Sequence, residues 1–376
     1  MSETTRFKKN DYVIAKTDDF PDGAQGEIID FRRHDTQAYI HFINQDKRLD
    51  RWVDIGTLRL NPDQINVNSK NKKSHDNSDE EQPELIKFEE VHKEITKIRN
   101  IDMITIGNYT MRTWYFSPFP YPYFEMDHIY MCEHCFTYFA SEKDLQDHIH
   151  ELNETYPPGR EIYRDGNLSI YELKGKNQKI PCQNLCLLSK LFLDHKTLFY
   201  DVEGFEFYVL CECDNSGSHL AAYFSREIKS SQGNILACIT TLPPFQKKGY
   251  GHLLISLAYE LAKRQKRSGG PETPLSDLGK IAFKTYWRYA IVNALKKGEN
   301  QISSIDDIVV ETAIDRKDII KTLKKLNLVR ERNDEFKLIV SKEKWKDVCS
   351  QPEFNQPKMT VKSNLLIWIP KEEDET

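Results

Sequence analysis

The sequence predicts an α+β protein in which a small all-β module precedes a larger mixed domain. Short β-branched and aromatic runs, separated by Asp, Pro and Gly turn residues, fill residues 6–60 and are typical of the strands of a small barrel. Strand-like runs at 205–210 and 220–225 are followed by apolar residues at helical spacing from Leu253, which indicates a sheet flanked by helices. A length of 376 residues suggests two or three domains.

Composition excludes some classes of function. A net charge of −5 argues against bulk nucleic-acid binding and favours basic partners or local basic patches. Eight cysteines, in a chain whose start Met1-Ser2-Glu3 shows no secretory leader, indicate a reducing compartment with thiols free or bound to metal. No apolar run reaches the ~18 residues of a membrane span. We therefore expect a soluble intracellular protein without membrane contact.

The N-terminal module combines aromatic and basic side chains. Its strand-like runs lie at 12–15, 25–29 and 38–42. Trp52, Tyr39 and Phe42 form either the core of the module or part of an aromatic cage, and the sequence leaves that choice open. Five basic side chains are candidates for phosphate contacts, namely Arg32, Arg33, Lys47, Arg48 and Arg51.

Two segments have compositions that do not support a core. Residues 63–86 are rich in Asn, Ser, Lys and Asp and almost free of large apolar residues, which predicts a flexible linker that keeps the module separate from the rest. The residues past 370 form a charged tail that we expect to be disordered.

The strongest local signal lies at residues 235–255. Ile235 to Leu242 is an apolar, β-branched run that ends at two prolines and predicts a buried strand. A glycine-containing basic loop, Gln246 to Gly251, leads into a helix. Unpaired N–H groups at a helix N-terminus bind anions, and glycines let a phosphate approach them. The stretch therefore predicts an anion-binding cradle.

A second motif has the spacing of a zinc finger. Cys132 and Cys135 are separated by two residues, and twelve more precede His148. Two thiolates on a knuckle and an imidazole on a following helix supply three of the four ligands of a structural zinc. His150, Glu154 or a residue elsewhere could complete the set, and the spacing does not choose among them.

The C-terminal third predicts two helices and a hairpin. Ile305, Ile308 and Val309 share one helical face, and Asp315 is placed to cap a second helix. Two strand-like runs then flank Asn333-Asp334. The basic cluster at 263–267 is expected to be a solvated helix end, with DNA contact as the second hypothesis.

Four blocks identify a family. The chain closely resembles the MYST histone acetyltransferases over about residues 95–300, and its blocks follow one another in the order found in that family. The blocks are Asn184–Lys196, Gln246–Gly251, Gly270–Gly279 and Tyr286-Trp287. The N-terminal module looks like the chromo barrel of one branch of that family, and the C-terminal elements are similar to its winged helix.

The resemblance implies a domain organisation. It comprises a chromo barrel (Tudor-knot) at 1–62, a linker at 63–92 and a MYST acetyltransferase domain at 93–370. Within the last lie a zinc-finger module at about 125–155, a GNAT-like sheet that binds acetyl-CoA at about 160–295, and a winged-helix-like module at about 300–345. Many relatives supply a fourth zinc ligand as a cysteine where this chain has Leu152, and some have lost the metal.

The resemblance also assigns catalytic roles. A lysine nucleophile is almost fully protonated near pH 7, and removing its proton costs roughly 4–5 kcal/mol. Glu272, in a proline-rich turn, matches the family's general base. Cys238 matches its active-site cysteine, for which we favour a lining role in direct attack over an acetyl-cysteine intermediate. Lys196 matches the lysine that these enzymes acetylate on themselves.

The remaining expectations concern cofactor and partners. The residues expected at acetyl-CoA are Ile239, Thr241, Gln246, Lys247, Lys248, Gly249, Tyr250, Gly251, His252, Ser276 and Thr285. Two of these positions differ from what is usual in the family. Lys247 stands where arginine is usual, and His252 stands where lysine or arginine is usual. The resemblance implies a nuclear enzyme that acetylates histone tails, histone H4 preferred, inside a chromatin complex, with DNA or RNA contact through the barrel. The alternative is a catalytically weak chromatin adaptor that docks through barrel and winged helix; a DNA-binding regulator fits the acidic balance poorly.

Overall fold

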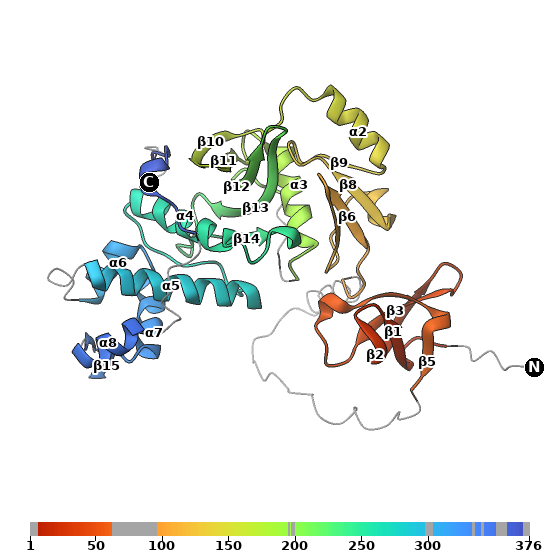
Figure 1. Ribbon diagram of the computed structural model, residues 1–376, viewed down its shortest axis with the longest axis horizontal. Helices are drawn as coiled ribbons and strands as arrows, with labels where there is room; N and C mark the ends of the chain where they lie inside the picture. Colours follow the sequence, from red (N-terminus) through yellow and green to blue (C-terminus); the bar gives the residue numbers. More distant parts are fainter. Residues whose placement is uncertain are drawn as a thin grey trace, which may run out of the picture. The chain divides into compact units, whose positions relative to one another are not determined.

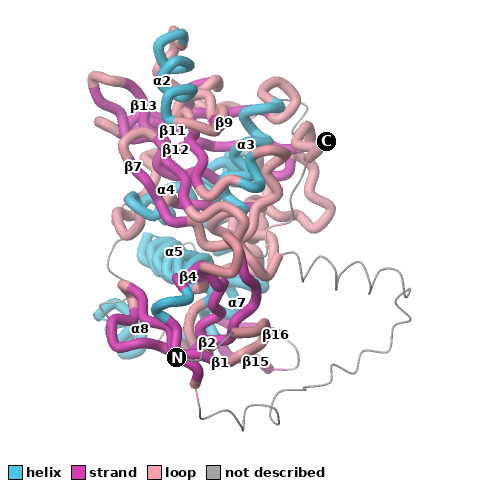
Figure 2. The backbone as a smooth tube through the Cα atoms, turned by 90° about the vertical axis from the view of Figure 1, so that its right-hand side faces the viewer, coloured by secondary structure: helices cyan, strands magenta, loops and turns pink. Residues whose placement is uncertain are grey.

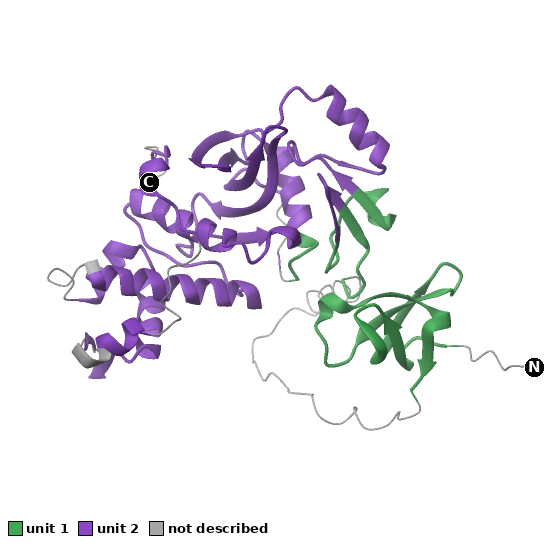
Figure 3. Cartoon of the chain, in the orientation of Figure 1, with its two compact units in different colours: residues 1–104, 112–129, 190–194 green, residues 105–111, 130–189, 195–376 purple. Residues whose placement is uncertain are grey.

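The computed structural model describes residues 7–61, 96–194, 196, 200–297, 304–332, 335–339, 342–350 and 359–370. The expected linker at 63–92 and the tail past 370 lie outside these residues. The chain divides into two compact units, with residues 1–104, 112–129 and 190–194 in unit 1 and residues 105–111, 130–189 and 195–376 in unit 2 (Figure 3). Among the described residues, unit 1 consists mainly of strands and short 3-10 turns, whereas unit 2 combines a sheet with nearly all of the α-helices, which confirms the α+β class (Figures 1 and 2).

The N-terminal module is a five-stranded sheet of order β4-β3-β2-β1-β5. Its strands are β1 (Tyr12–Thr17), β2 (Phe20–Arg32), β3 (Gln37–Phe42), β4 (Arg51–Asp54) and β5 (Leu58–Leu60). Alternate residues of β1 and β3, such as Val13 and Ile40, point into a small apolar core that also holds Phe42. Trp52 is only half-buried and lies outside that core.

The zinc-finger region begins with a four-stranded sheet of order β7-β6-β8-β9. Its strands are β6 (Met103–Ile106), β7 (Tyr109–Arg112), β8 (His128–Met131) and β9 (Tyr138–Phe139). Helix α2 (Glu142–Glu151) follows, and the Ser141 hydroxyl caps it by accepting the Asp144 N–H. The strand–knuckle–helix order expected for the zinc motif is thus formed.

The central sheet of unit 2 is antiparallel, and its strands follow one another in sequence order. They are β10 (Arg160–Asp165), β11 (Leu168–Lys174), β12 (Phe205–Asp214), β13 (Gly217–Glu227) and β14 (Cys238–Thr241). Helices α3 (Lys179–Lys190), α4 (Tyr250–Arg264) and α5 (Asp277–Lys297) accompany it. Helix α4 packs against β12, β13 and β14 and buries leucines over most of its length. Among the described residues, no helix is both long and apolar enough to span a bilayer.

Strand β14 is shorter than the expected run from Ile235 to Leu242. Ile235 donates its N–H to Gly270 (3.0 Å), and Leu236 forms a parallel bridge with Pro271, so this end of the run pairs with the 270–272 loop. The sequence pattern gave the apolar character of the run but not the change of partner halfway along it.

The C-terminal elements match the expected order. Helices α6 (Ile305–Thr312) and α7 (Arg316–Lys325) are followed by the antiparallel strands β15 (Val329–Arg332) and β16 (Glu335–Leu338), and by α8 (Lys342–Ser350). Asp315 caps α7 by accepting the Lys317 N–H, as expected. The turn at Asn333-Asp334 lies outside the described residues.

The basic cluster at 263–267 is not simply a solvated helix end. Arg264, in the last turn of α4, donates to the carbonyl oxygens of Ser363, Leu366 and Trp368 at 2.6–3.0 Å. The Trp368 indole in turn donates to Glu172 (2.6 Å), on β11. Arg264 therefore fixes the C-terminal segment on the sheet, a contact between residues about 100 positions apart that no local pattern could indicate.

Candidate active site

Glu272 is held beside the start of β14 by the backbone. Its N–H donates to the Leu236 carbonyl (2.8 Å), next to the Leu236–Pro271 bridge. Cys238, two residues after Leu236, is the first residue of β14 and pairs with Ser225 on β13. A loop residue and a strand residue more than 30 positions apart thus reach the same edge of the sheet.

The Glu272 carboxylate has the environment of a proton acceptor. The side chain is half-buried and, among the described residues, makes no hydrogen bond or ion pair. Burial raises the pKa of Glu272; Glu227 adds to the rise, and Lys196 partly opposes it. A carboxylate with a raised pKa is a better base than an exposed one, because its proton affinity lies closer to that of the amine.

Lys196 interacts electrostatically with both Glu272 and Cys238. The side chains of Lys196 and Cys238 are half-buried. Burial lowers the pKa of Lys196, whereas interactions with the sulfur atoms of Cys238 and Cys186 and with the Glu272 carboxylate raise it, and the net direction is a rise. Lys196 is therefore a stable ammonium at neutral pH. The three residues singled out by the sequence form one electrostatically coupled cluster.

Tyr223, on β13, is buried and interacts with Cys238. Its hydroxyl donates to the Leu185 carbonyl on α3 (2.6 Å). Burial, together with the nearby Cys238 and Cys186 thiols, raises the pKa of Tyr223 well above its ordinary value. The hydroxyl therefore stays neutral. The sequence analysis did not single out this tyrosine, whose pattern is that of any aromatic in a buried strand.

The backbone that precedes α4 forms an anion cradle. A short 3-10 turn, Pro243–Phe245, leads from β14 to the loop. Gly249 is the N-cap of α4 and has φ 105°, a left-handed conformation that favours glycine. No side chain caps this helix end, so its first N–H groups are left for an external acceptor. A Cβ atom placed on Gly251 would meet nothing within 4 Å, which leaves room for a bound group.

Side chains of the loop are used mainly to hold it. The Gln246 amide donates to the Thr241 carbonyl (3.1 Å), at the end of β14. Lys248 pairs with Glu212 on β12 (2.8 Å), and the Tyr250 hydroxyl donates to the same carboxylate. The hydrogen bonds from Lys248 and Tyr250 outweigh burial and lower the pKa of Glu212. Backbone N–H groups, rather than Lys248, are thus what the loop offers to a pyrophosphate.

Glu212 was missed by the sequence analysis. It fixes two residues of the cofactor loop from a strand almost 40 positions earlier, and no local motif marks it. An acidic residue near the end of a strand is indistinguishable in sequence from any solvated carboxylate.

Three of the expected cofactor residues have local roles. The Ser276 hydroxyl accepts the Gly279 N–H (3.1 Å) at the start of α5, and the Thr285 hydroxyl donates to the Ile281 carbonyl within that helix (2.9 Å). Burial lowers the pKa of His252, although a hydrogen bond with the Ala282 backbone acts in the opposite direction. The imidazole is therefore neutral and adds no positive charge for a pyrophosphate.

The three residues of the zinc motif converge. The ligand atoms of Cys132, Cys135 and His148 lie within 4.8 Å of one another, with 3.2 Å between the Cys135 sulfur and His148 Nε2. Zinc bonds of about 2.3 Å to sulfur and 2.0 Å to nitrogen fit inside such a set. His150 and Glu154 are exposed and lie outside the group, so neither completes it. A zinc bound here would fasten the β8–β9 knuckle to α2.

The arrangement in unit 2 suits one class of reaction. An anion cradle at the end of a strand, beside a carboxylate of raised pKa, allows an amine to attack an acyl group carried by a phosphate-containing thioester. Three family models match the chain, namely the MOZ/SAS family over residues 156–366, the MYST family zinc finger domain over 98–151, and the RNA binding activity-knot of a chromodomain over 12–60. The chain therefore belongs to the MYST family.

Curated relatives agree with this assignment. Histone acetyltransferase MOF of Drosophila melanogaster is 43% identical over 286 residues, which cover 76% of this chain and 34% of that protein. Histone acetyltransferase of the MYST family 2 of Arabidopsis thaliana is 38% identical over 90% of this chain and 79% of its own length. The Tip60 homolog of Caenorhabditis elegans is 35% identical over 89% and 84%, respectively. The chain thus spans about a third of the fruit-fly relative and most of the other two.

Proposed function

We propose that this protein transfers the acetyl group of acetyl-CoA to lysine side chains of histone tails, histone H4 preferred, with Glu272 as the general base. The observation that carries the proposal is the half-buried Glu272 carboxylate, which has a raised pKa and whose backbone N–H is bonded to Leu236, two residues before Cys238. The names of the relatives, all histone acetyltransferases, support the substrate class.

The proposed reaction is a direct transfer. Glu272 takes a proton from the substrate ammonium, and the neutral amine attacks the thioester carbonyl. The carbon–sulfur bond of acetyl-CoA then breaks, the CoA sulfur takes the second proton that the attacking nitrogen loses and leaves as the thiol, and a secondary amide of the lysine remains. The N–H groups at the start of α4 hold the pyrophosphate, while Ile239 and Thr241 on β14 present backbone groups to the acyl arm.

Cys238 lines the site in this proposal. A cysteine acts as a nucleophile only as a thiolate, and a covalent route would need a base for its thiol. Lys196 is a stable ammonium and cannot serve as that base. Glu272 would then have to deprotonate first the thiol and later the amine, so direct attack needs fewer proton transfers.

The family and the relatives' names imply a role on chromatin, and we propose that the protein works in the nucleus as a subunit of a chromatin-modifying complex. In this scheme residues 93–370 carry the reaction, the zinc module and the winged-helix-like module support it, and Lys196 is a site of self-acetylation.

One experiment tests the function directly. The purified full chain is incubated with radiolabelled acetyl-CoA and an equimolar mixture of core histones, which are then separated on a gel. We expect label on histone H4 above the other histones and none with Glu272→Gln over the same time. Tight acetyl-CoA binding by calorimetry without transfer to any histone would refute the proposal and favour the adaptor hypothesis.

A further inference from the structure

The basic residues of the barrel are engaged inside unit 1. We expected the linker to keep the barrel apart and its basic side chains to meet phosphates. Instead, each of the five forms an ion pair with an aspartate of the same unit, namely Arg32 with Asp102 and Asp127, Arg33 with Asp127, Lys47 with Asp194, Arg48 with Asp46, and Arg51 with Asp19. Asp102, Asp127 and Asp194 belong to the part of the chain that follows the linker.

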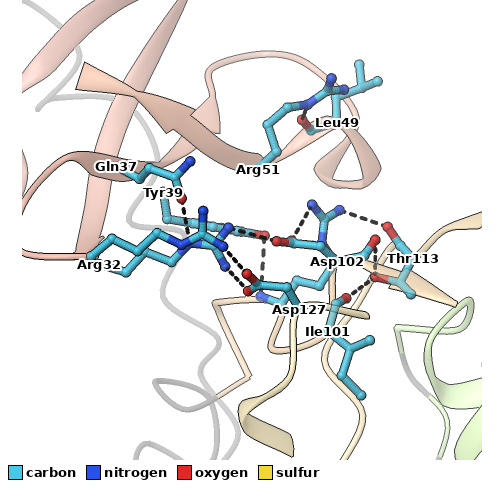
Figure 4. Close-up of polar contacts among 11 residues, drawn as sticks. Arg32, Gln37, Tyr39, Leu49, Arg51, Ile101, Asp102, Thr113 and Asp127 are labelled. Atoms are coloured by element: carbon cyan, nitrogen blue, oxygen red, sulfur yellow. Dashed lines mark hydrogen bonds and ion pairs between the residues drawn. The ribbon is translucent and has the colours of Figure 1, made fainter. Parts of the chain in front are cut away.

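Arg32 is the centre of the first set of contacts (Figure 4). Its guanidinium, at the end of β2, donates to Asp127 (2.6 Å) and to Asp102 (2.9 Å). The other oxygen of Asp102 accepts from Arg99 at 3.1 and 3.2 Å, and Arg99 also donates to the Thr113 carbonyl (2.8 Å). Arg99 is 3% exposed, so the shared carboxylate links a barrel arginine to a buried one.

The aromatic pair of the barrel belongs to the same contact. The Arg32 guanidinium lies 4.5 Å from the Trp52 ring centroid, and Trp52 packs edge-on against Tyr39. The Tyr39 hydroxyl accepts the backbone N–H of Arg99 (3.4 Å). An arginine of the protein itself therefore occupies the aromatic face that an external methylated lysine would need.

A second set of contacts reaches residues 190–194. Lys47 pairs with Asp194 (3.1 Å) and lies 5.7 Å from the Tyr115 ring, while Arg48 lies 5.2 Å from the Trp114 ring. The backbone N–H groups of Trp114 and Tyr115 both donate to the Leu191 carbonyl, at 2.8 and 3.0 Å. The barrel thus contacts the 190–194 segment both directly and through 114–115.

We propose that the barrel is a positioning element for the acetyltransferase reaction. Lys47 holds Asp194 directly, Arg48 packs on Trp114, whose N–H is bonded to Leu191, and Lys196 follows Asp194 by two positions in the chain. Lys47 and Asp194 are positioning residues, since neither is part of the catalytic cluster. The expected effect on turnover rests on the proposed function. The expected effect on the 190–194 segment does not.

If the basic residues of the barrel bound nucleic acid, the phosphates would compete with the aspartates for these side chains. Arg112, which is exposed and has no ion pair among the described residues, lines a cavity with Arg48 and Arg51. A phosphate bound there would compete with the aspartates for the two barrel arginines. The two roles therefore predict different effects when the contact is broken.

The test uses charge reversal in the full chain. Lys47→Glu and Asp194→Lys each place like charges together, and the double variant restores an opposite pair. Arg59→Glu, an exposed basic residue of β5 outside these contacts, is the matched control. Deuterium exchange is followed at the Trp114 and Tyr115 amides. Steady-state kinetics are measured on a free histone H4 peptide.

We expect each single variant to speed exchange at these two amides about three- to tenfold, because a partly exposed ion pair is replaced by a repulsion. We expect kcat to fall by a similar factor with the KM for acetyl-CoA unchanged, and the double variant to recover both. Arg59→Glu should match wild type.

Exchange and kcat unchanged in both single variants, or a double variant no better than the singles, would overturn the proposal. Loss of RNA or DNA binding in Lys47→Glu with exchange unchanged would overturn it too, in favour of a nucleic-acid module. If wild type itself transfers no acetyl group, the proposed function fails, while the exchange measurement still tests the contact.

Discussion

The two units contain charge clusters that differ in whether the central carboxylate is paired with a basic side chain. In unit 1 the Asp102 carboxylate lies between Arg32 and Arg99 and accepts hydrogen bonds from both. In unit 2 the Glu272 carboxylate is half-buried without such a partner among the described residues, and its pKa is raised. Paired charges hold segments in place, whereas an unpaired carboxylate that is partly desolvated retains its affinity for a proton. Changing each cluster should therefore affect different quantities.

Glu272→Gln should have the largest effect, because it keeps the shape and removes the proton acceptor. We expect turnover near neutral pH to fall by roughly 10²–10⁴. Acetyl-CoA binding, measured by calorimetry, should hardly change, since in the proposed function the pyrophosphate is held by the α4 N-terminus and not by Glu272. Raising the pH should partly restore the rate as more substrate lysine is already neutral.

Cys238→Ser is the comparison within the same cluster, and direct attack predicts that it is the milder change. A Cys238→Ser enzyme that is inactive but binds acetyl-CoA normally, together with an active Glu272→Gln enzyme, would reverse the assignment of roles.

Cys132, Cys135 and His148 form a third kind of cluster, in which a bound metal would hold the side chains together. We expect about one zinc per chain by elemental analysis of the tag-free protein. Cys135→Ser should lose the metal and lower the melting temperature by roughly 5 °C or more, because zinc binding contributes directly to folding. Cys349→Ser, a cysteine outside the group, is the control. Well under half an equivalent of zinc in the wild type would refute the site.

Arg32→Ala tests the paired cluster through stability. It leaves Asp102 and Asp127 without a partner from β2 and exposes the Trp52 face, so we expect a loss of about 1–2 kcal/mol in the free energy of unfolding by urea. Arg33 is 57% exposed against 22% for Arg32, so Arg33→Ala should cost less, about 0.5 kcal/mol or under. Equal effects of the two variants would contradict the central place given to Arg32.

The smallest effect concerns the pH dependence of the rate. Glu272 must be ionised to act as a base, so activity falls as the pH drops through its raised pKa. The Lys196 ammonium holds that pKa down, and Lys196→Gln removes the charge. The acidic limb of the kcat/KM profile should therefore move to higher pH, by less than about one unit, while Lys196→Arg keeps the wild-type profile. A shift to lower pH in Lys196→Gln would contradict the coupling.

Self-acetylation at Lys196 is checked by peptide mass spectrometry after incubation with acetyl-CoA. The raised pKa of Lys196 makes this transfer dependent on a base, so we expect much less modification in Glu272→Gln. Histones acetylated by a wild-type enzyme whose Lys196 stays unmodified would refute the assignment.

The sequence by itself determined the elements whose signals are local. The glycine loop before α4, the cap at Asp315, the paired strands around Asn333-Asp334 and the spacing of Cys132, Cys135 and His148 are all patterns within a few residues or one turn of chain. Such patterns reflect backbone conformation and ligand geometry, which neighbouring residues set. The match of whole blocks to the MYST family then supplied Glu272, Cys238 and Lys196 as site residues.

Only the tertiary structure decided which distant charges meet. The sequence gives no sign that Arg32 pairs with Asp102 and Asp127, that Glu212 holds the cofactor loop, or that Arg264 binds the C-terminal segment. A surface arginine and a pairing arginine look alike in sequence, because an ion pair depends on where two chain segments converge rather than on residue type. The same reason explains why the raised pKa of Glu272 became visible only with its burial and its neighbours in place.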